Sequence, residues 1–195
     1  MSQHAKKYFD IVSQISSIID VEKINIICSE LNTLRENNGR LFFLGVGGSA
    51  ANCSHAVNDF RKLCNIESYT ATDNVSELTA RINDDGWDGS FVEYLKSSNI
   101  KSKDAIFILS VGGGNTEKNV SVNLINAINY CKKIGSKIFG IVGKDGGYTF
   151  KNGDNILLVP DLDKKLTTPL AESFQAVVWH CIVSNPLLQL NSTKW

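Results

Sequence analysis

The sequence has no apolar run long enough to cross a membrane and no excess of charge of either sign. A membrane-spanning helix needs about 20 predominantly apolar residues, and the polar stretch 1–10 does not resemble a secretion signal. Lysine and arginine number 20 together, as do aspartate and glutamate, so the formal net charge is zero. This balance gives no electrostatic reason to expect nucleic acid or an anionic membrane as a partner. We therefore expect a cytoplasmic protein that binds neither.

The cysteines do not show the pattern of a disulfide framework. They number five, an odd count, and no two are spaced as Cys-x-x-Cys. A reducing compartment fits this usage best. A thiol within an apolar stretch usually acts as a small hydrophobic side chain, and four of the five lie in such stretches. These are Cys28, Cys53, Cys131 and Cys181.

The chain has no internal repeat, low-complexity tract or linker, so its 195 residues predict one domain with a substantial core. Apolar residues recur at helical spacing over residues 8–34, which predicts one long helix or two helices with a break at Asp20. We expect residues 1–38 to form an N-terminal helical arm and residues 40–188 an α/β core. Such an arm often packs on a neighbouring subunit.

After the arm, short buried-strand runs alternate with helices, which predicts a parallel, doubly wound sheet. The predicted strands are residues 41–44, 68–71, 105–109, 137–142 and 156–159. The predicted helices are residues 49–63, 75–82, 90–96, 116–134 and 169–188, with a turn over Asn83–Gly86.

Three predicted strands end in glycine-rich turns, at residues 45–50, 110–115 and 143–147. In open α/β sheets, ligands bind beyond the carboxyl ends of strands, where helix N-termini present unpaired N–H groups. Ser49 could add a side-chain contact to an anion, or could only cap its helix. Ser110 and Asn115 could contribute in the same way. Alternatively, the glycines only let helices pack closely on strands.

The first turn also matches the G-x-G-x-x-A form of the dinucleotide fingerprint. The acid expected after the second strand would be Asp73, which follows Gly45 by nearly thirty residues rather than about twenty. A second glycine turn after the third strand fits a sugar phosphate better than a dinucleotide.

Histidine is scarce, and the two histidines beyond His4 lie in helices that also carry carboxylates. His55 and Asp59 are spaced i, i+4 and project from one helix face. Glu172 and His180 are two turns apart and also share a face. Such a set could bind a divalent metal or move a proton, and the spacing does not choose between these roles. Each histidine could also be a core residue, Asp59 could pair with a neighbouring base, and Glu172 could be a favourable first-turn charge.

Taken together, these motifs resemble the sugar isomerase (SIS) domain, and within it the phosphoheptose isomerase group. The likeness covers residues 41–184. It rests on the Gly-x-Gly-Gly-Ser turn, the His/acid pair, an Asn-Asp pair at Asn83 and Asp84, the Gly-Lys-Asp-Gly-Gly turn, and the polar residues 172 and 180.

The resemblance implies that residues 1–195 form a single SIS domain with a three-layer α/β/α fold, flavodoxin-like, around a five-stranded parallel sheet. It also implies a homotetramer with active sites at subunit interfaces. The implied reaction converts sedoheptulose 7-phosphate, a phosphorylated ketose, to an aldose heptose 7-phosphate that supplies heptose for surface polysaccharides such as lipopolysaccharide.

The resemblance further implies the roles of individual residues. Zinc would be held by His55, Asp59, Glu172 and His180, although nickel, cobalt or iron suits the same donors. Asp59 or Glu172 would be the base, and His180 would move a proton between sugar oxygens. The substrate would contact Gly47, Gly48, Ser49, Asn83, Asp84, Ser110, Gly112 and Asn115.

Three positions depart from the family pattern. The phosphate loop of the family is rich in hydroxyl groups, whereas the matching loop here is Ser110-Val111-Gly112-Gly113-Gly114-Asn115. Asp59 stands where the family has a glutamate, and Glu172 stands where it has a glutamine. The two carboxylate changes could compensate each other, or could indicate another substrate.

Other functions compete with the enzyme. SIS-domain proteins of this size also serve as sugar-phosphate sensors or as tetrameric partners of the bacterial replication initiator. Such adaptors generally lack a complete polar set, so the His and carboxylate residues favour an enzyme. The hypothesis of a nucleotide-binding oxidoreductase is supported by the G-x-G-x-x-A match alone.

Overall fold

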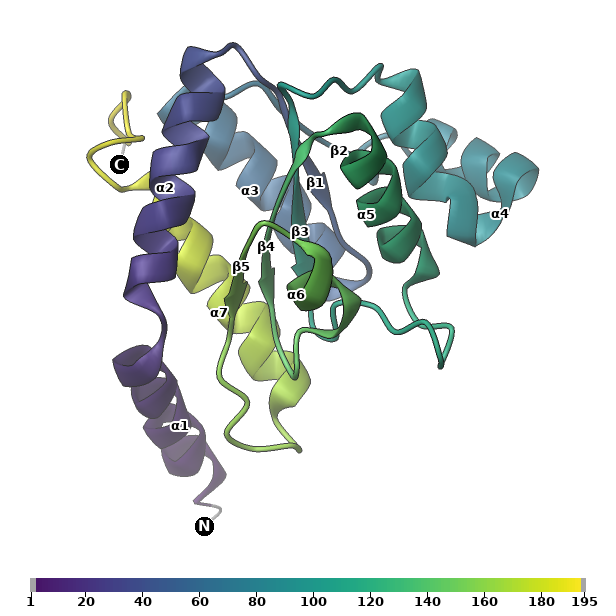
Figure 1. Cartoon of the computed structure of the whole chain (residues 1–195). Coiled ribbons are helices and arrows are strands. Elements are labelled where there is room, and N and C mark those ends of the chain that lie inside the picture. The colour runs from purple at the N-terminus through teal and green to yellow at the C-terminus, as the bar shows by residue number, and fades with distance from the viewer. Residues whose placement is uncertain (1–2, 194–195) are drawn as a thin grey trace.

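Five parallel strands form one sheet in the order β2-β1-β3-β4-β5 in the computed structural model, which describes residues 3–193 (Figure 1). The strands are β1 (Leu41–Leu44), β2 (Ser68–Thr70), β3 (Ala105–Ser110), β4 (Lys137–Val142) and β5 (Asn155–Leu158). This order is the flavodoxin-like one, in which β1 and β3 lie side by side at the switch point of the sheet. The predicted parallel sheet is confirmed, and its strand bounds differ from prediction by a residue at some ends.

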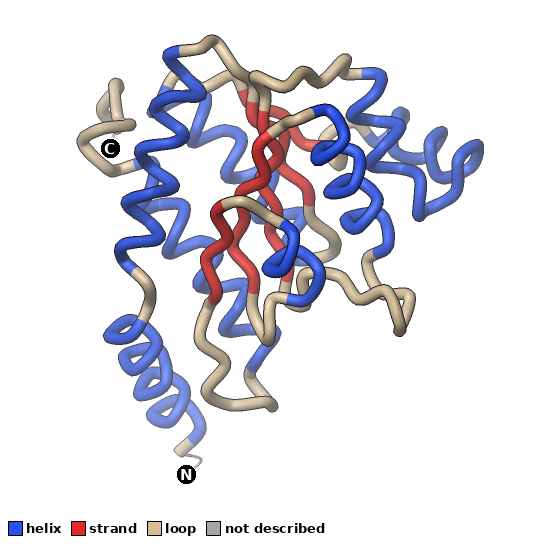
Figure 2. Tube along the Cα trace, viewed as in Figure 1, coloured by secondary structure: helices blue, strands red, loops and turns tan. Residues whose placement is uncertain are grey.

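Helices cover both faces of the sheet (Figure 2). They are α1 (His4–Ile18), α2 (Val21–Glu36), α3 (Gly48–Cys64), α4 (Val75–Ser97), α5 (Val122–Ile134), α6 (Gly147–Asn152) and α7 (Thr167–Val183). None of the helices within residues 3–193 is long and apolar enough to cross a membrane.

Alternate strand side chains enter two cores on opposite faces of the sheet. Leu41 and Phe43 pack with α2, α3 and α7, whereas Phe42 and Leu44 pack with α4 and α5. Successive side chains of a strand point to opposite faces, and covering both faces buries all four. Full burial of each such side chain contributes about 1.5–3 kcal/mol. The three-layer α/β/α architecture is therefore confirmed.

The N-terminal region consists of two helices that meet at Asp20. The Asp20 side chain accepts a hydrogen bond from the N–H of Lys23 and so caps the start of α2. The buried face of α2 includes Ile27 and Leu31, which join the core on the side of the sheet that α3 and α7 cover.

Two helix bounds differ from prediction for local reasons. The turn expected over Asn83–Gly86 is helical up to Gly86, which alone departs from helical geometry, with φ 73° and ψ 164°. The helix expected from residue 116 begins only at Val122. Before it, the Asn115 side chain accepts a hydrogen bond from the N–H of Lys118, and Asn115 pairs with Val120. An asparagine that bonds to nearby backbone favours a turn over a helix.

The remaining differences lie near the C-terminal part of the core. The third glycine turn leads into α6, a helix of one and a half turns that was not predicted, and α7 ends at Val183 rather than at residue 188.

Cysteine burial follows the helix faces. Cys28, Cys53 and Cys131 are buried as expected, and Cys64 is buried as well. Burial raises the pKa of the Cys28 thiol to about 11 and that of the Cys131 thiol to about 12, so both stay protonated at neutral pH. The expectation for Cys181 was wrong, because it lies on the outer side of α7 and is exposed.

Candidate active site

The predicted site residues of α3 and α7 meet where these two helices pack against the same face of the sheet (Figure 1). We call this contact the α3–α7 seam. From the starts of the helices onward, it pairs Glu172 with Gly48, Gln175 with Ser49 and Asn52, and Trp179 and His180 with His55 and Asp59.

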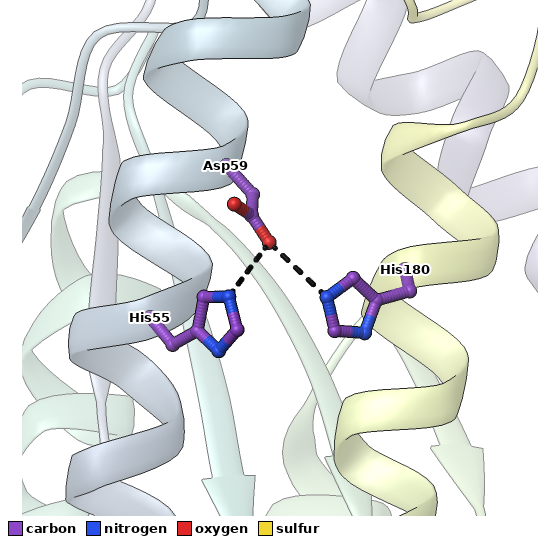
Figure 3. Close-up of side chains that lie close together, drawn as sticks. All are labelled: His55, Asp59 and His180. Atoms are coloured by element: carbon purple, nitrogen blue, oxygen red, sulfur yellow. Dashed lines mark ion pairs between the residues drawn. The ribbon is translucent and has the colours of Figure 1, made fainter. Parts of the chain in front are cut away.

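His55, Asp59 and His180 converge at the far end of the seam (Figure 3). Nε2 of each histidine lies 3.4 Å from Oδ2 of Asp59, and the three ligand atoms lie within 4.8 Å of one another. The side chains of His55 and His180 are 57% and 51% exposed, whereas that of Asp59 is 9% exposed. A buried carboxylate therefore faces two imidazoles that are open to solvent.

Hydrogen bonding determines which nitrogen of His180 is available. Its Nδ1 lies 2.9 Å from the carbonyl oxygen of Ala176, and a carbonyl oxygen can only accept, so Nδ1 carries the proton. In the neutral ring, Nε2 then presents a lone pair toward Asp59 Oδ2, which is also an acceptor. Such facing acceptors are stabilised when a proton or a metal cation lies between them, so the cluster suits a cation.

Two neighbours hold the Asp59 carboxylate. The indole N–H of Trp179 donates to Oδ2 at 3.2 Å, and the side-chain amide of Asn58 donates to Oδ1 at 3.1 Å. Sequence reasoning gave Trp179 no role. Its one signal was its place next to His180 in an apolar helix.

Glu172, the predicted fourth member, lies apart from this cluster. A Cβ built on Gly48 would lie 2.6 Å from both carboxylate oxygens of Glu172, so the carboxylate rests against the start of α3. A helix N-terminus is a favourable place for a negative charge. Eight residues separate Glu172 from His180, which is about 12 Å along the helix, so sharing a face does not bring them together. One chain therefore brings together three residues that could hold a cation, with Glu172 at the glycine turn.

Gln175 lies along the seam between Glu172 and the His55, Asp59 and His180 cluster. It is fully buried, its Nε2 donates to Ser49 Oγ at 3.0 Å, and its Oε1 accepts from the Asn52 amide at 2.8 Å. Asn52 also donates to the backbone carbonyl of Glu172 at 3.0 Å. These bonds fix the first residues of α3 relative to α7.

The second and third glycine turns hold each other. The N–H groups of Tyr148 and Thr149 donate to the carbonyls of Gly114 and Gly113, and a Cβ on Gly113 would lie 1.9 Å from the Gly146 carbonyl oxygen. The third turn and the start of α6 therefore hold the backbone of the second turn in place.

Within the second turn, the N–H of Gly113 donates to Ser110 Oγ at 3.0 Å. The hydroxyl that remains from the family's hydroxyl-rich loop therefore supports the backbone of this turn. Asn115, at the end of the turn, uses its side-chain oxygen to hold Lys118.

Asn83 and Asp84 lie on α4, which covers the other face of the sheet (Figure 1). Both are exposed, and the Asn83 amide donates to the Asp84 carboxylate at 2.8 Å. A single chain does not bring this pair to the α3–α7 seam.

Comparison with known proteins gives the chain's relatives, although no model of a known protein family matches it. The phosphoheptose isomerase of Aliarcobacter butzleri (strain RM4018) is 30% identical over 167 residues, which cover 83% of this chain and 81% of that protein. The lincomycin biosynthesis protein LmbN of Streptomyces lincolnensis is 28% identical over 156 residues, and the match covers 76% of this chain but 56% of LmbN. The solved phosphoheptose isomerase of Neisseria gonorrhoeae has the same fold, with a TM-score of 0.77 at 21% identity over 92% of both chains.

These likenesses extend over most of the chain, and the structural likeness agrees with the strand order. They define a sugar isomerase domain, and the protein is a sugar-phosphate isomerase. Within that class, the chain belongs to the phosphoheptose isomerase family, from whose members it has diverged considerably in sequence.

Proposed function

We propose that the protein converts sedoheptulose 7-phosphate to D-glycero-D-manno-heptose 7-phosphate, which would supply heptose for surface polysaccharides. Its relatives named phosphoheptose isomerase support this substrate. The observation that carries the proposal is the layout of the α3–α7 seam, which has the glycine turns at one end and the His55, Asp59 and His180 cluster about two helical turns away. An extended seven-carbon sugar phosphate is long enough to reach from one end to the other.

The phosphate belongs at the second glycine turn in this proposal. The Glu172 carboxylate already lies at the start of α3, so a phosphate there would meet a like charge. Ser110, Gly112 and Asn115 would instead surround the phosphate, beyond the carboxyl end of β3.

The first turn would hold the sugar. Gly47 and Gly48 let the sugar chain approach the backbone closely, and the buried Ser49 would face a sugar hydroxyl. The Glu172 carboxylate would accept a hydrogen bond from another hydroxyl.

We assign the metal, preferably zinc, to His55, Asp59 and His180. The donor set fits, since two imidazole nitrogens and a carboxylate oxygen converge and leave room for a further ligand. When bound, such an ion would polarise the sugar carbonyl.

The proton transfers need a base beside the carbonyl and an acid that serves the oxygens. We assign the base to Asp59, because it lies in the cluster while Glu172 lies about 12 Å further along the seam. Nε2 of His180, whose ring is held by the Ala176 carbonyl, would be a metal ligand in this arrangement, so another acid must serve the sugar oxygens.

The functional unit in this proposal is a homotetramer with sites at subunit interfaces. Phe9, Ile18 and Val21 of the arm are 69%, 57% and 58% exposed, an apolar surface that a second copy could cover. Asn83 and Asp84 lie away from their own seam and would reach the seam of a neighbouring copy. Light scattering on the purified protein tests the assembly, and a monomer at micromolar concentration would refute it.

The reaction is tested by incubating sedoheptulose 7-phosphate with metal-stripped and zinc-restored protein and following heptose 7-phosphate by NMR. Product that depends on zinc is expected, with none from unphosphorylated sedoheptulose, the matched control. Absence of product with zinc restored would refute the reaction. Asp59→Asn should abolish turnover, whereas Glu172→Gln should mainly raise KM; the reverse result would move the base to Glu172.

A further inference from the structure

One oxygen of Asp59 contacts three side chains at once. Oδ2 accepts the indole N–H of Trp179 at 3.2 Å and lies 3.4 Å from Nε2 of both His55 and His180. A carboxylate oxygen has two lone-pair directions, so the indole occupies one and leaves the other facing the imidazoles. The indole thereby sets the direction in which this oxygen can bind a cation.

Trp179 is well placed to hold that direction. Its side chain is among the largest that are fully buried, and an indole N–H can donate but not accept. Its ring also contacts both imidazoles, with centroid separations of 5.3 Å to His55 and 5.0 Å to His180. A rigid, buried donor therefore touches all three members of the cluster.

The position of Trp179 in the chain makes this possible. Trp179 and His180 are adjacent on α7, so they point in directions about 100° apart around the helix. Trp179 turns inward between the helices and His180 turns toward solvent, and both reach the same carboxylate. The buried carboxylate would otherwise lack a fixed N–H donor on this oxygen.

We propose that Trp179 is a positioning residue for the metal site, acting through its hydrogen bond to Asp59 Oδ2. This inference rests on the proposed function only in taking the cluster as a metal site. Loss of a group that orients a metal ligand typically weakens metal binding 10- to 100-fold.

The test is zinc titration of Trp179→Phe against a chromophoric chelator, without substrate. Phenylalanine keeps an aromatic ring and removes the N–H. We expect zinc affinity 10- to 100-fold below wild type. Trp87→Phe is the matched control, because Trp87 lies on α4 and is 40% exposed, and its zinc affinity should equal that of wild type.

The outcomes separate the two proposals. Wild-type affinity in Trp179→Phe, with binding lost in Asp59→Asn, would overturn the role of Trp179 and leave the metal site intact. No zinc binding by the wild type would overturn both. Since no substrate is used, failure of the isomerase reaction would not affect this result.

A second measurement covers the case in which Trp179→Phe does not fold. The indole N–H resonance of Trp179 in metal-free wild type can be assigned by elimination. The resonances that disappear in Trp87→Phe and in Trp195→Phe belong to those two residues, and the third belongs to Trp179. We expect it to be protected from solvent exchange and to shift in Asp59→Asn. A resonance that exchanges rapidly with solvent and has the same chemical shift in Asp59→Asn as in wild type would overturn the proposal.

Discussion

Replacing Gln175 by methionine should destabilise the protein by about 2 kcal/mol. Gln175 is fully buried, and its amide hydrogen-bonds Ser49 Oγ at 3.0 Å and the Asn52 amide at 2.8 Å. Methionine is unbranched and similar in length, so the change removes polar contacts with little loss of volume. A buried group that loses its partner costs about 1–3 kcal/mol. Asn52 keeps its bond to the Glu172 carbonyl, so we count the penalty mainly for Ser49.

Urea denaturation of metal-free protein, followed by circular dichroism, measures this difference. For a chain of this size, about 2 kcal/mol corresponds to a fall in Tm of about 4–8 °C. The matched control is Gln14→Met, on the exposed face of α1, which should change stability by less than about 0.5 kcal/mol.

Removing both partners gives a sharper test. In Ser49→Ala, the hydroxyl is already absent, so adding Gln175→Met should cost less than it does in wild type. A Gln175→Met protein as stable as wild type, or strict additivity in the double variant, would show that these hydrogen bonds do not hold the seam together.

Three further predictions concern single residues. Gly48→Ala places a methyl group 2.6 Å from the Glu172 carboxylate oxygens, so it should displace that carboxylate and lower kcat/KM at least tenfold in a steady-state assay. His180→Gln should abolish turnover while circular dichroism shows a folded protein, because glutamine lacks the imidazole nitrogen that the proposed metal site uses. Burial alone would raise the pKa of Asp104, but hydrogen bonds from Arg40 outweigh it and lower that pKa below its usual value. Its stabilisation is therefore present above about pH 4 and is lost as pH falls through the lowered pKa, so Asp104→Asn should be less stable than wild type at pH 7, by about 1–3 kcal/mol, and converge with it in acid.

Each of these has a contrary outcome. Gly89→Ala, in an open part of α4, controls for the added methyl group, and equal activity of both alanine variants would contradict the Glu172 contact. Retained turnover in His180→Gln would remove that residue from the mechanism. A pH-independent difference between Asp104→Asn and wild type would contradict the linkage.

The sheet could be predicted because each strand carries its own evidence. Strands buried on both faces appear as short continuous apolar runs, as in Leu41–Leu44, and a capping acid marked the start of α2. The start of α5 could not be predicted, because Asn115 and the left-handed Ser121, with φ 53°, interrupt an otherwise helical pattern. The short α6 depends on contacts with the second glycine turn rather than on its own sequence.

The candidate site was predictable where spacing within one helix was enough. His55 and Asp59 are one turn apart, and their side chains do lie together. The roles of Trp179 and Gln175 depend on how α7 lies against α3, which no local pattern reveals. Glu172 shows the converse. Its spacing from His180 puts both on one face of α7, but the rise of about 12 Å along the helix places Glu172 at Gly48 rather than in the cluster.

The distance along the chain between the two halves of the seam bears on how the protein matures. Trp179 and Asp59, whose hydrogen bond closes the cluster, are separated by 120 residues. On a translating ribosome, the strands and the helices that precede α7 are made while the cluster is still incomplete. If the cluster holds the proposed metal, its capture must therefore wait until α7 has been synthesised and has packed against α3. Zinc uptake during cell-free synthesis would then report when α7 packs against α3.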